Sequence, residues 1–110
     1  MKHPCVYILA SRRNGTLYVG ITTDLAKRMA EHDQGMLPGF TSRYGIYQLV
    51  YFEHHVTIPE AIQREKTVKR WHRQWKLRLI ESMNPEWTNL YNPATGEIAL
   101  GPFDHLRNRS

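Results

Sequence analysis

The sequence predicts a small α+β fold, in which a three-stranded, mostly antiparallel sheet is flanked by helices in the order β-β-α-β-α-α. Two β-branched and aromatic stretches, residues 5–10 and 17–22, flank an Asn-Gly pair, the strongest short hairpin pattern. A helical stretch follows them, and a third strand-like stretch at 48–53 precedes two further helical segments. With 110 residues, the chain has room for one hydrophobic core.

The predicted hairpin brings two tyrosines together. A two-residue turn on the Asn-Gly pair places Tyr7 opposite Thr22. Side chains alternate faces along a strand and opposed residues share a face, so Tyr7 and Tyr18 lie on one face beside Gly20. A register shifted by two residues keeps this result, whereas a shift by one destroys it. A purely structural role stays open, because tyrosines are common in half-exposed strands.

The helices are predicted from their terminal residues. Asp24, preceded by a threonine, favours a helix over residues 25–34, which the following glycine ends. Thr57 and Pro59 favour the start of a second helix that runs to about residue 71. A further helical stretch, residues 73–82, ends before the next proline.

The domain organisation follows from where these patterns stop. Residues 36–45 contain proline and two glycines and are expected to form a loop. Residues 84–110 are rich in Asn, Pro and Gly and show no clear period. We therefore expect a domain over residues 1–83 and a partly ordered C-terminal extension over 84–110.

Composition narrows the class of protein. No stretch approaches eighteen apolar residues, so no membrane span is expected. The single cysteine, Cys5, excludes an intrachain disulfide and a multi-cysteine zinc site, which favours a reducing, cytoplasmic location. The formal charge is +5, and seven Lys or Arg lie between residues 60 and 80 against two glutamates. This favours a polyanionic partner, although a solvated cationic face is the alternative.

Glu65 is the carboxylate with the most unusual position. On a helical wheel it shares a stripe with Ala61 and Val68, and a core-facing carboxylate is costly unless it is paired or bound to a cation. One carboxylate with water and substrate phosphate is a usual way to hold Mg²⁺. A structural salt bridge to an arginine, or a wheel in the wrong register, is the alternative.

Arg28 and His32 form a second candidate group. Their i, i+4 spacing makes them neighbours at the inner edge of the first helix. Arginine suits bidentate phosphate binding, and histidine can exchange a proton near neutral pH. An ordinary surface Arg–His pair is the alternative.

The order of these residues resembles a known family. The triplets Cys5-Val6-Tyr7 and Tyr18-Val19-Gly20 look like the motif pair of the GIY-YIG family, with departures at the first two positions of the first triplet and at the valine of the second. The segment Asp24-Leu25-x-x-Arg28-x-x-x-His32 and the later Arg64-Glu65-x-x-x-Lys69 resemble the segments that follow in that family. The resemblance covers about residues 4–82 and is closest to small bacterial stand-alone GIY-YIG proteins of the endonuclease type.

The resemblance implies a metal-dependent endonuclease that hydrolyses phosphodiester bonds in DNA, in DNA repair or processing. It implies Glu65 as the ligand of one Mg²⁺ or Mn²⁺ ion, Tyr7 as a candidate general base and Arg28 as the phosphate clamp. Tyr18 and His32 would orient the water, the base or the phosphate. A tyrosine of ordinary pKa is a poor base, so Tyr7 would need a lowered pKa.

Other readings stay open beside this one. The same fold could serve as a nucleic-acid-binding module with little or no catalysis, or as an adaptor for a protein partner. Nucleic-acid affinity is expected from Lys69, Arg70, Arg73 and Lys76. The choice between DNA and RNA and the preferred DNA structure are left open, and a monomer is favoured over an oligomer.

Overall fold

A three-stranded antiparallel sheet forms the centre of the protein, as the sequence predicts. The computed structural model describes residues 3–35 and 48–99. The strands are β1 (Cys5–Ala10), β2 (Leu17–Thr22) and β3 (Gln48–His54), in the spatial order β2-β1-β3. The helices and two short C-terminal strands are α1 (Leu25–Asp33), α3 (Ile58–Arg70), α4 (Arg73–Met83), β4 (Tyr91–Asn92) and β5 (Glu97–Ile98). The loop expected over residues 36–45 lies outside the described residues.

The hairpin register differs from the expected one by two residues. Tyr7 lies opposite Gly20 rather than Thr22. The turn spans four residues because the Gly15 N–H donates to the Arg12 carbonyl, and the Ser11 N–H donates to the Thr16 carbonyl. The expected two-residue turn requires a positive φ at both central positions. Asn14 has a positive φ of 57°, but the φ of Gly15 is not positive. The face assignment of the tyrosines is confirmed, because a shift by two preserves the alternation.

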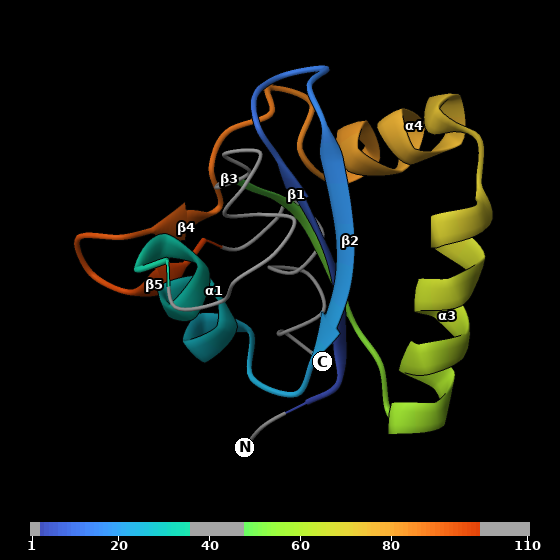
Figure 1. The fold of residues 1–110 in the computed structure, drawn as a ribbon, viewed down its shortest axis with the longest axis horizontal. Coiled ribbons are helices and arrows are strands. Elements are labelled where there is room, and N and C mark those ends of the chain that lie inside the picture. The colour runs from blue at the N-terminus through green and yellow to red at the C-terminus, as the bar shows by residue number, and fades with distance from the viewer. Residues whose placement is uncertain (1–2, 36–47, 100–110) are drawn as a thin grey trace, which may run out of the picture.

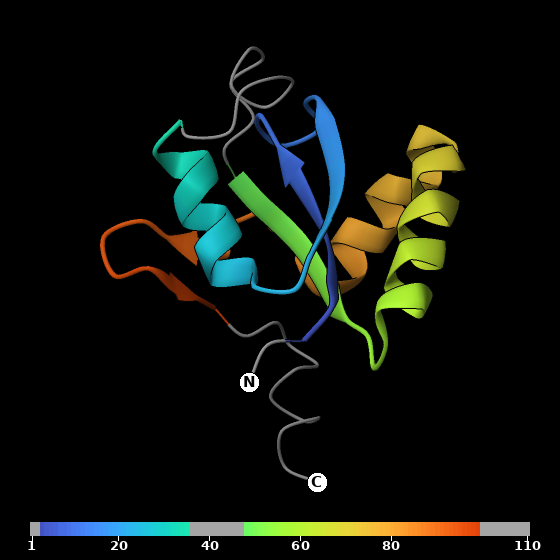
Figure 2. The same ribbon diagram turned by 60° about the horizontal axis from the view of Figure 1, so that its bottom comes forward.

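The two faces of the sheet are covered by different helices. Tyr7 pairs with Gly20 and Phe52 on one face, and the adjacent Val6 pairs with Ile21 and Glu53 on the other. The first face carries α1, whose His32 contacts Tyr7, and the second carries α3, whose Arg64 contacts Glu53. Figures 1 and 2 show α1 on one side of the sheet and α3 with α4 on the other.

Helices α1 and α3 begin where their capping residues predict, whereas His72 at the start of α4 makes no side-chain cap. The Asp24 carboxylate accepts a hydrogen bond from the Lys27 N–H at the start of α1, and Gly35, with φ 68°, follows its end. The Thr57 hydroxyl accepts one from the Glu60 N–H at the start of α3. The chain leaves helical geometry between α3 and α4, at Trp71 and His72, which turns α4 away from the axis of α3 (Figure 1).

The segment after α4 shares the core of the sheet as far as it is described. Trp87, Leu90 and Tyr91 are buried in the same cluster as the strands. The buried Asn84 amide donates to the Val50 carbonyl, and the Leu90 N–H donates to the Leu49 carbonyl. The buried apolar residues of this segment are not spaced at the hydrophobic period of a helix or a strand. Their packing therefore cannot be predicted from the sequence pattern. The division of the chain into residues 1–83 and 84–110 stays a prediction.

Candidate active site

Two tyrosines meet on the α1 face of the sheet. The rings of Tyr7, on β1, and Tyr18, on β2, lie with their centroids 6.3 Å apart. Gly20 makes room for them, because a Cβ at this position would lie 2.6 Å from the Tyr7 hydroxyl and 2.9 Å from Tyr18 Cε1. The glycine is therefore required by the close approach of both rings.

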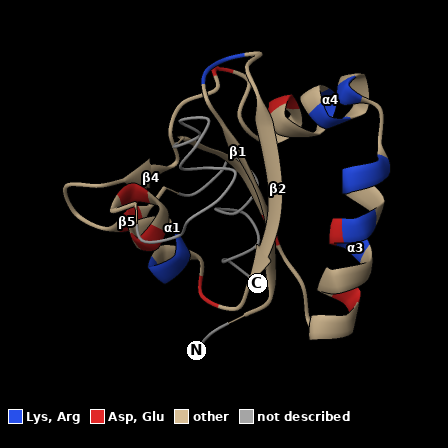
Figure 3. Ribbon diagram, in the orientation of Figure 1, with Lys and Arg blue, Asp and Glu red and all other residues tan. Residues whose placement is uncertain are grey.

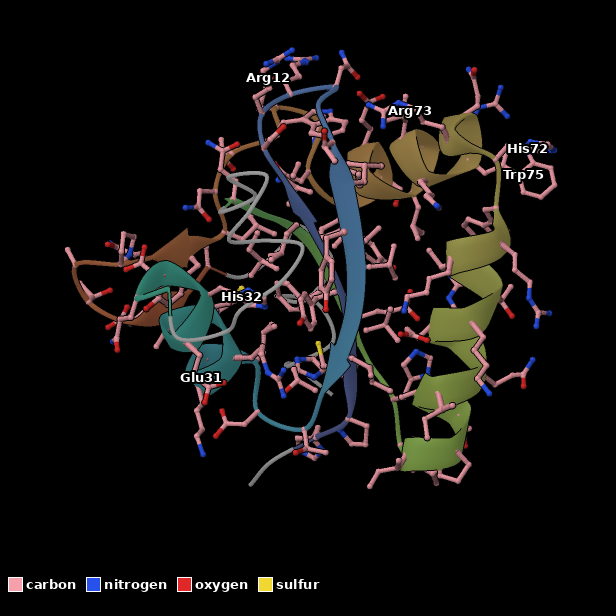
Figure 4. The ribbon with its side chains drawn as sticks, in the orientation of Figure 1. Arg12, Glu31, His32, His72, Arg73 and Trp75 are labelled. Carbon is pink, nitrogen blue, oxygen red and sulfur yellow. The ribbon has the colours of Figure 1, made fainter. Side chains whose placement is uncertain are left out.

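His32 completes an aromatic cluster with the tyrosines. It belongs to the buried stripe of α1 with Leu25 and Met29, and only 6% of it is exposed. Its Nε2 lies 3.3 Å from the Tyr7 hydroxyl, and its ring centroid is 6.0 Å from that of Tyr18. Figure 4 shows His32 pointing from α1 toward the sheet. The i, i+4 spacing predicted the helix edge, but the contact with Tyr7 depends on how α1 packs.

Arg28 supplies a positive charge beside this cluster. Its guanidinium forms an ion pair of 3.6 Å with Glu31, which lies three residues further along α1. A hollow of about 150 Å³ next to it is lined by Thr22, Thr23, Asp24, Lys27, Arg28 and Glu31. Arg28 is half-exposed, so a phosphate entering this hollow could replace Glu31 as its partner.

Burial and charge determine the protonation of the cluster. Burial raises the pKa of Tyr7, and Tyr18 adds to this, while the Arg28 charge opposes it without cancelling it. Burial lowers the pKa of His32, and Arg28 lowers it further. At neutral pH, Tyr7 is a phenol and His32 a neutral imidazole, so the Tyr7 hydroxyl can donate its proton to Nε2. The pKa of Tyr7 is therefore raised, whereas a role as general base on its own would require a lowered pKa.

Glu65 lies on the other side of the sheet from the tyrosines. It sits on α3 between the fully buried Ala61 and Val68, with 13% of its side chain exposed, as the helical wheel predicted. Its carboxylate pairs with Lys69 Nζ at 2.8 Å rather than with an arginine. The structure thus brings Tyr7 and Tyr18 together with the α1 residues, and it does not place Glu65 on that face.

Only the edge strand β2 lies between α3, which carries Glu65, and the tyrosine cluster on the other face. Within the described sheet β2 is at the edge, α3 packs against it on one face, and Tyr18 projects from its other face. Figure 1 shows β2 in front of β1, between α1 and α3. Groups on both sides of an edge strand can reach a ligand that lies across its free edge.

A part-buried hydrogen-bond network around Glu53 was not predicted from the sequence. The Glu53 carboxylate accepts hydrogen bonds from the Tyr51 hydroxyl and from Arg64 Nε at 3.0 Å, and His55 Nε2 also contacts it. Burial opposes ionisation of Glu53, but these hydrogen bonds outweigh it and lower its pKa. No sequence pattern links positions 53 and 64, because only the packing of α3 on β3 joins them. The Glu53 carboxylate already has three side-chain partners, so we assign the network a structural role.

The predicted basic residues divide between two helices. Lys69 and Arg70 lie at the end of α3, and Lys69 is the partner of Glu65. Arg73 and Lys76 begin α4, where Arg73 Nη2 donates to the carbonyls of Asn14 and Gly15 at 2.6 Å each. Figure 3 shows Lys and Arg positions, in blue, along the ribbons of both helices, on the side of the sheet opposite α1. The break at His72 therefore separates the four residues into two pairs.

The domain thus has an α+β fold in which β1 and β2 each carry one tyrosine of the cluster. Helix α1 carries Arg28 and His32, and α3 carries Glu65. The GIY-YIG catalytic domain model matches residues 3–78. The chain belongs to the GIY-YIG family, a nuclease superfamily.

Relatives of similar size share this domain. A UPF0213 protein of Staphylococcus saprophyticus is 39% identical over 75 residues, which cover 68% of this chain and 90% of the relative. A UPF0213 protein of Bacillus pumilus is 35% identical over 85 residues, covering 77% and 87%. The solution NMR structure of a UPF0213 protein from Bacillus halodurans matches with a TM-score of 0.50 and 31% identity over 81% of this chain and 93% of that one.

Among the described residues, no helix has the length and hydrophobicity to span a bilayer.

Proposed function

We propose that this protein is a metal-dependent endonuclease that hydrolyses phosphodiester bonds in DNA. The observation that carries the proposal is the hydrogen bond between the buried Tyr7 hydroxyl and His32 Nε2, with Arg28 beside it. Membership of a nuclease superfamily supplies the reaction class. The proposed site lies across the free edge of β2, with the tyrosine cluster on one side and Glu65 on the other.

The resting protonation states suggest how the cluster moves a proton. His32 is neutral and can accept the Tyr7 proton through Nε2. The raised pKa of Tyr7 and the lowered pKa of His32 both oppose a separate transfer between them, so the Tyr7 oxygen takes the proton of the attacking water as its own proton passes to Nε2. Arg28 binds the non-bridging phosphate oxygens after leaving Glu31, and Tyr18 orients the phosphate or the water.

Glu65 has the chemistry of a divalent-cation ligand. It is a carboxylate on a stripe where packing alone favours an apolar residue, and its partner Lys69 is exposed enough to move into solvent. No group of three or more His, Cys, Asp or Glu that could hold a metal lies among the described residues. One carboxylate completed by waters and phosphate oxygens is a mode that Mg²⁺ and Mn²⁺ accept. A bound ion would supply charge stabilisation at the phosphate.

A cleavage assay tests this function. Labelled single-stranded, duplex and branched DNA are incubated with the protein in Mg²⁺, Mn²⁺ or EDTA. We expect cleavage that depends on metal and is lost in Glu65→Gln, because the amide keeps the volume but is a poor cation ligand. Glu60→Gln on the same helix is the matched control, since Glu60 is exposed and lies in the first turn. Full activity of Glu65→Gln would refute the metal-ligand role, and unfolding of this variant would indicate a structural ion pair.

Two observations are compatible with a second function. The raised pKa of Tyr7 and the ion pair that occupies Arg28 are what a domain that binds nucleic acid without cutting it would also have. Metal-independent binding with no cleavage of any substrate would favour this alternative. The role in DNA repair or processing and the cytoplasmic location remain predictions.

A further inference from the structure

We propose that the cationic pocket between the tip of the β1–β2 hairpin and the first turn of α4 binds a backbone phosphate of the nucleic acid, away from the phosphate at which the bond is cut. The inference rests on the proposed function, which makes a nucleic acid the ligand, and it adds a second contact point for that ligand. It is carried by a cavity, by the charges that line it and by the placement of those charges on α4.

The pocket is a large hollow with no acidic side chain in its lining. Its volume is about 560 Å³, and it is lined by Ser11, Arg12, Asn14, Gly15, Thr16, Leu17, Arg73 and Lys76. Three of these described residues are cationic, and they come from two segments that are far apart in the sequence. Figure 4 shows Arg12 at the hairpin tip and Arg73 on α4. Cations that converge on one hollow without a carboxylate among them favour an anionic ligand.

Arg73 holds the two sides of the pocket together. Its Nη2 donates to the carbonyls of Asn14 and Gly15, which joins the hairpin loop to α4. A guanidinium has five N–H donors, so Nε and Nη1 keep three donors that make no hydrogen bond to a described residue. Arg73 therefore shapes the pocket and can also donate to a phosphate inside it.

The first turn of α4 carries charges of the sign that a helix start disfavours. The N-terminus of a helix is the positive end of its dipole, so acidic residues stabilise this turn and basic residues destabilise it. The first turn of α4 contains no acidic residue, and its N-cap residue His72 makes no side-chain cap. Arg73 is instead the first residue of the helix and Lys76 the fourth. An anion in the pocket would offset this unfavourable arrangement.

Lys76 and Arg12 are the cations whose charge is left without a counter-ion. Burial lowers the pKa of Lys76, and the nearby Arg73 charge lowers it further. Arg12 is exposed at the hairpin tip. Neither side chain forms an ion pair with a described carboxylate, whereas Arg28 and Lys69 each have one. Both charges are therefore available to a phosphate, unlike those of the paired cations on α1 and α3.

The pocket and the hollow beside Arg28 lie at opposite ends of β2. Leu17, the first residue of the strand, lines the pocket, and Thr22, the last, lines the hollow. Five steps along an extended strand, at about 3.4 Å each, separate these ends by about 17 Å. One phosphate cannot occupy both places. For a duplex lying along β2, this separation corresponds to about five base pairs.

Binding of labelled DNA tests the inference. Fluorescein-labelled duplex and single-stranded DNA are titrated with protein at several salt concentrations, in EDTA so that cleavage does not interfere. The double variant Arg12→Gln with Lys76→Gln should lose about tenfold or more in affinity, because two charge-assisted contacts are removed. Its salt slope of binding should fall by up to about two. Arg73 is left unchanged, since its substitution would also release the hairpin loop.

A matched double variant controls for the loss of net charge. Lys66→Gln with Arg78→Gln removes two exposed cations outside the lining of the pocket, one on α3 and one on α4. It should keep most of the wild-type affinity, because charges away from the contact are screened over about 10 Å at 0.1 M salt. The single variant Arg12→Glu, at the exposed hairpin tip, tests the charge without altering the half-buried Lys76. It should also weaken binding.

Competition distinguishes a backbone phosphate from a free one. Inorganic phosphate and a mononucleotide offer the same chemical group, but each contacts the protein at one place only. They should displace DNA from the wild type only at concentrations far above its Kd for DNA. A mononucleotide that binds the wild type and not the pocket double variant, with DNA affinity equal in both, would overturn the inference in favour of a small ligand.

The outcomes separate this inference from the proposed function. Equal losses of affinity in the two double variants, or wild-type affinity in the pocket variant, would overturn the inference and leave the nuclease proposal intact. Absence of binding to any nucleic acid would overturn both. Pocket-dependent binding without cleavage would support the inference and favour the non-catalytic alternative.

Discussion

Substitution of Gly20 by alanine should disturb the tyrosine cluster more than any other change of one methyl group. The new Cβ would lie 2.5 Å from Tyr7 Cζ, 2.6 Å from the Tyr7 hydroxyl and 2.9 Å from Tyr18 Cε1. Tyr7 is fully buried, so it cannot rotate away without moving the core around it. Overpacking of this kind costs about 1–3 kcal/mol. For a domain of this size, each kcal/mol lowers the Tm by about 4–8 °C.

Urea unfolding followed by tryptophan fluorescence measures this cost, and the cleavage assay measures the effect on the site. We expect both stability and activity to fall, because the Tyr7 hydroxyl must leave His32 Nε2. Gly35→Ala is the control. Gly35 has open space around it but φ 68°, so alanine there should cost about 1–2 kcal/mol of backbone strain and leave cleavage unchanged. A Gly20→Ala protein with wild-type stability and activity would refute the steric argument.

Three further predictions concern the same cluster. Arg28→Ala should lower kcat by about 10²-fold or more, as expected for loss of one charge-stabilising group, and should keep DNA affinity within about tenfold of the wild type. Single-turnover cleavage measures the rate and fluorescence anisotropy measures the affinity. A rate near that of the wild type would exclude a role as phosphate clamp. Tyr7→Phe should reduce the rate more than Tyr18→Phe, because the Tyr7 hydroxyl is bonded to His32 Nε2; the reverse order would assign the proton transfer to Tyr18. Activity should fall on the acid side with a midpoint below pH 6.5, because burial and the Arg28 charge lower the pKa of His32 and its neutral form is required. NMR titration of the His32 ring checks this pKa directly. A midpoint above 6.5 would contradict the role of neutral His32 as proton acceptor.

The parts of the fold that depend on local chemistry could be predicted from sequence. Strand alternation was sufficient to place Tyr7 and Tyr18 on one face, even though the turn is two residues longer than expected. The helical wheel correctly predicted that Glu65 faces the core. It could not say which face of the sheet α3 would cover, because that depends on the path of the chain after β3.

The remaining features depend on contacts between distant segments. The Glu53–Arg64 pair joins a strand to a helix, and the hydrogen bonds of Arg73 join a helix to a hairpin loop. Neither has a period or a spacing in the sequence. Burial of Tyr7 within the assembled core also raises its pKa, which is the opposite of what a lone tyrosine base needs, and only the packed structure reveals it.

The position of β2 at the edge of the described sheet also bears on how the protein could be inhibited. An edge strand presents backbone N–H and C=O groups that can pair with another chain, and proteins often protect such edges with charged side chains. The strand Leu17–Thr22 contains no charged residue, and Gly20 at its centre has no side chain to hinder an approaching backbone. A peptide that added to β2 as a fourth strand would cover the edge between α1 and α3. Through its backbone hydrogen bonds to β2, the peptide would block the nucleic acid that we propose binds across this edge. The Tyr7–His32 pair would stay intact.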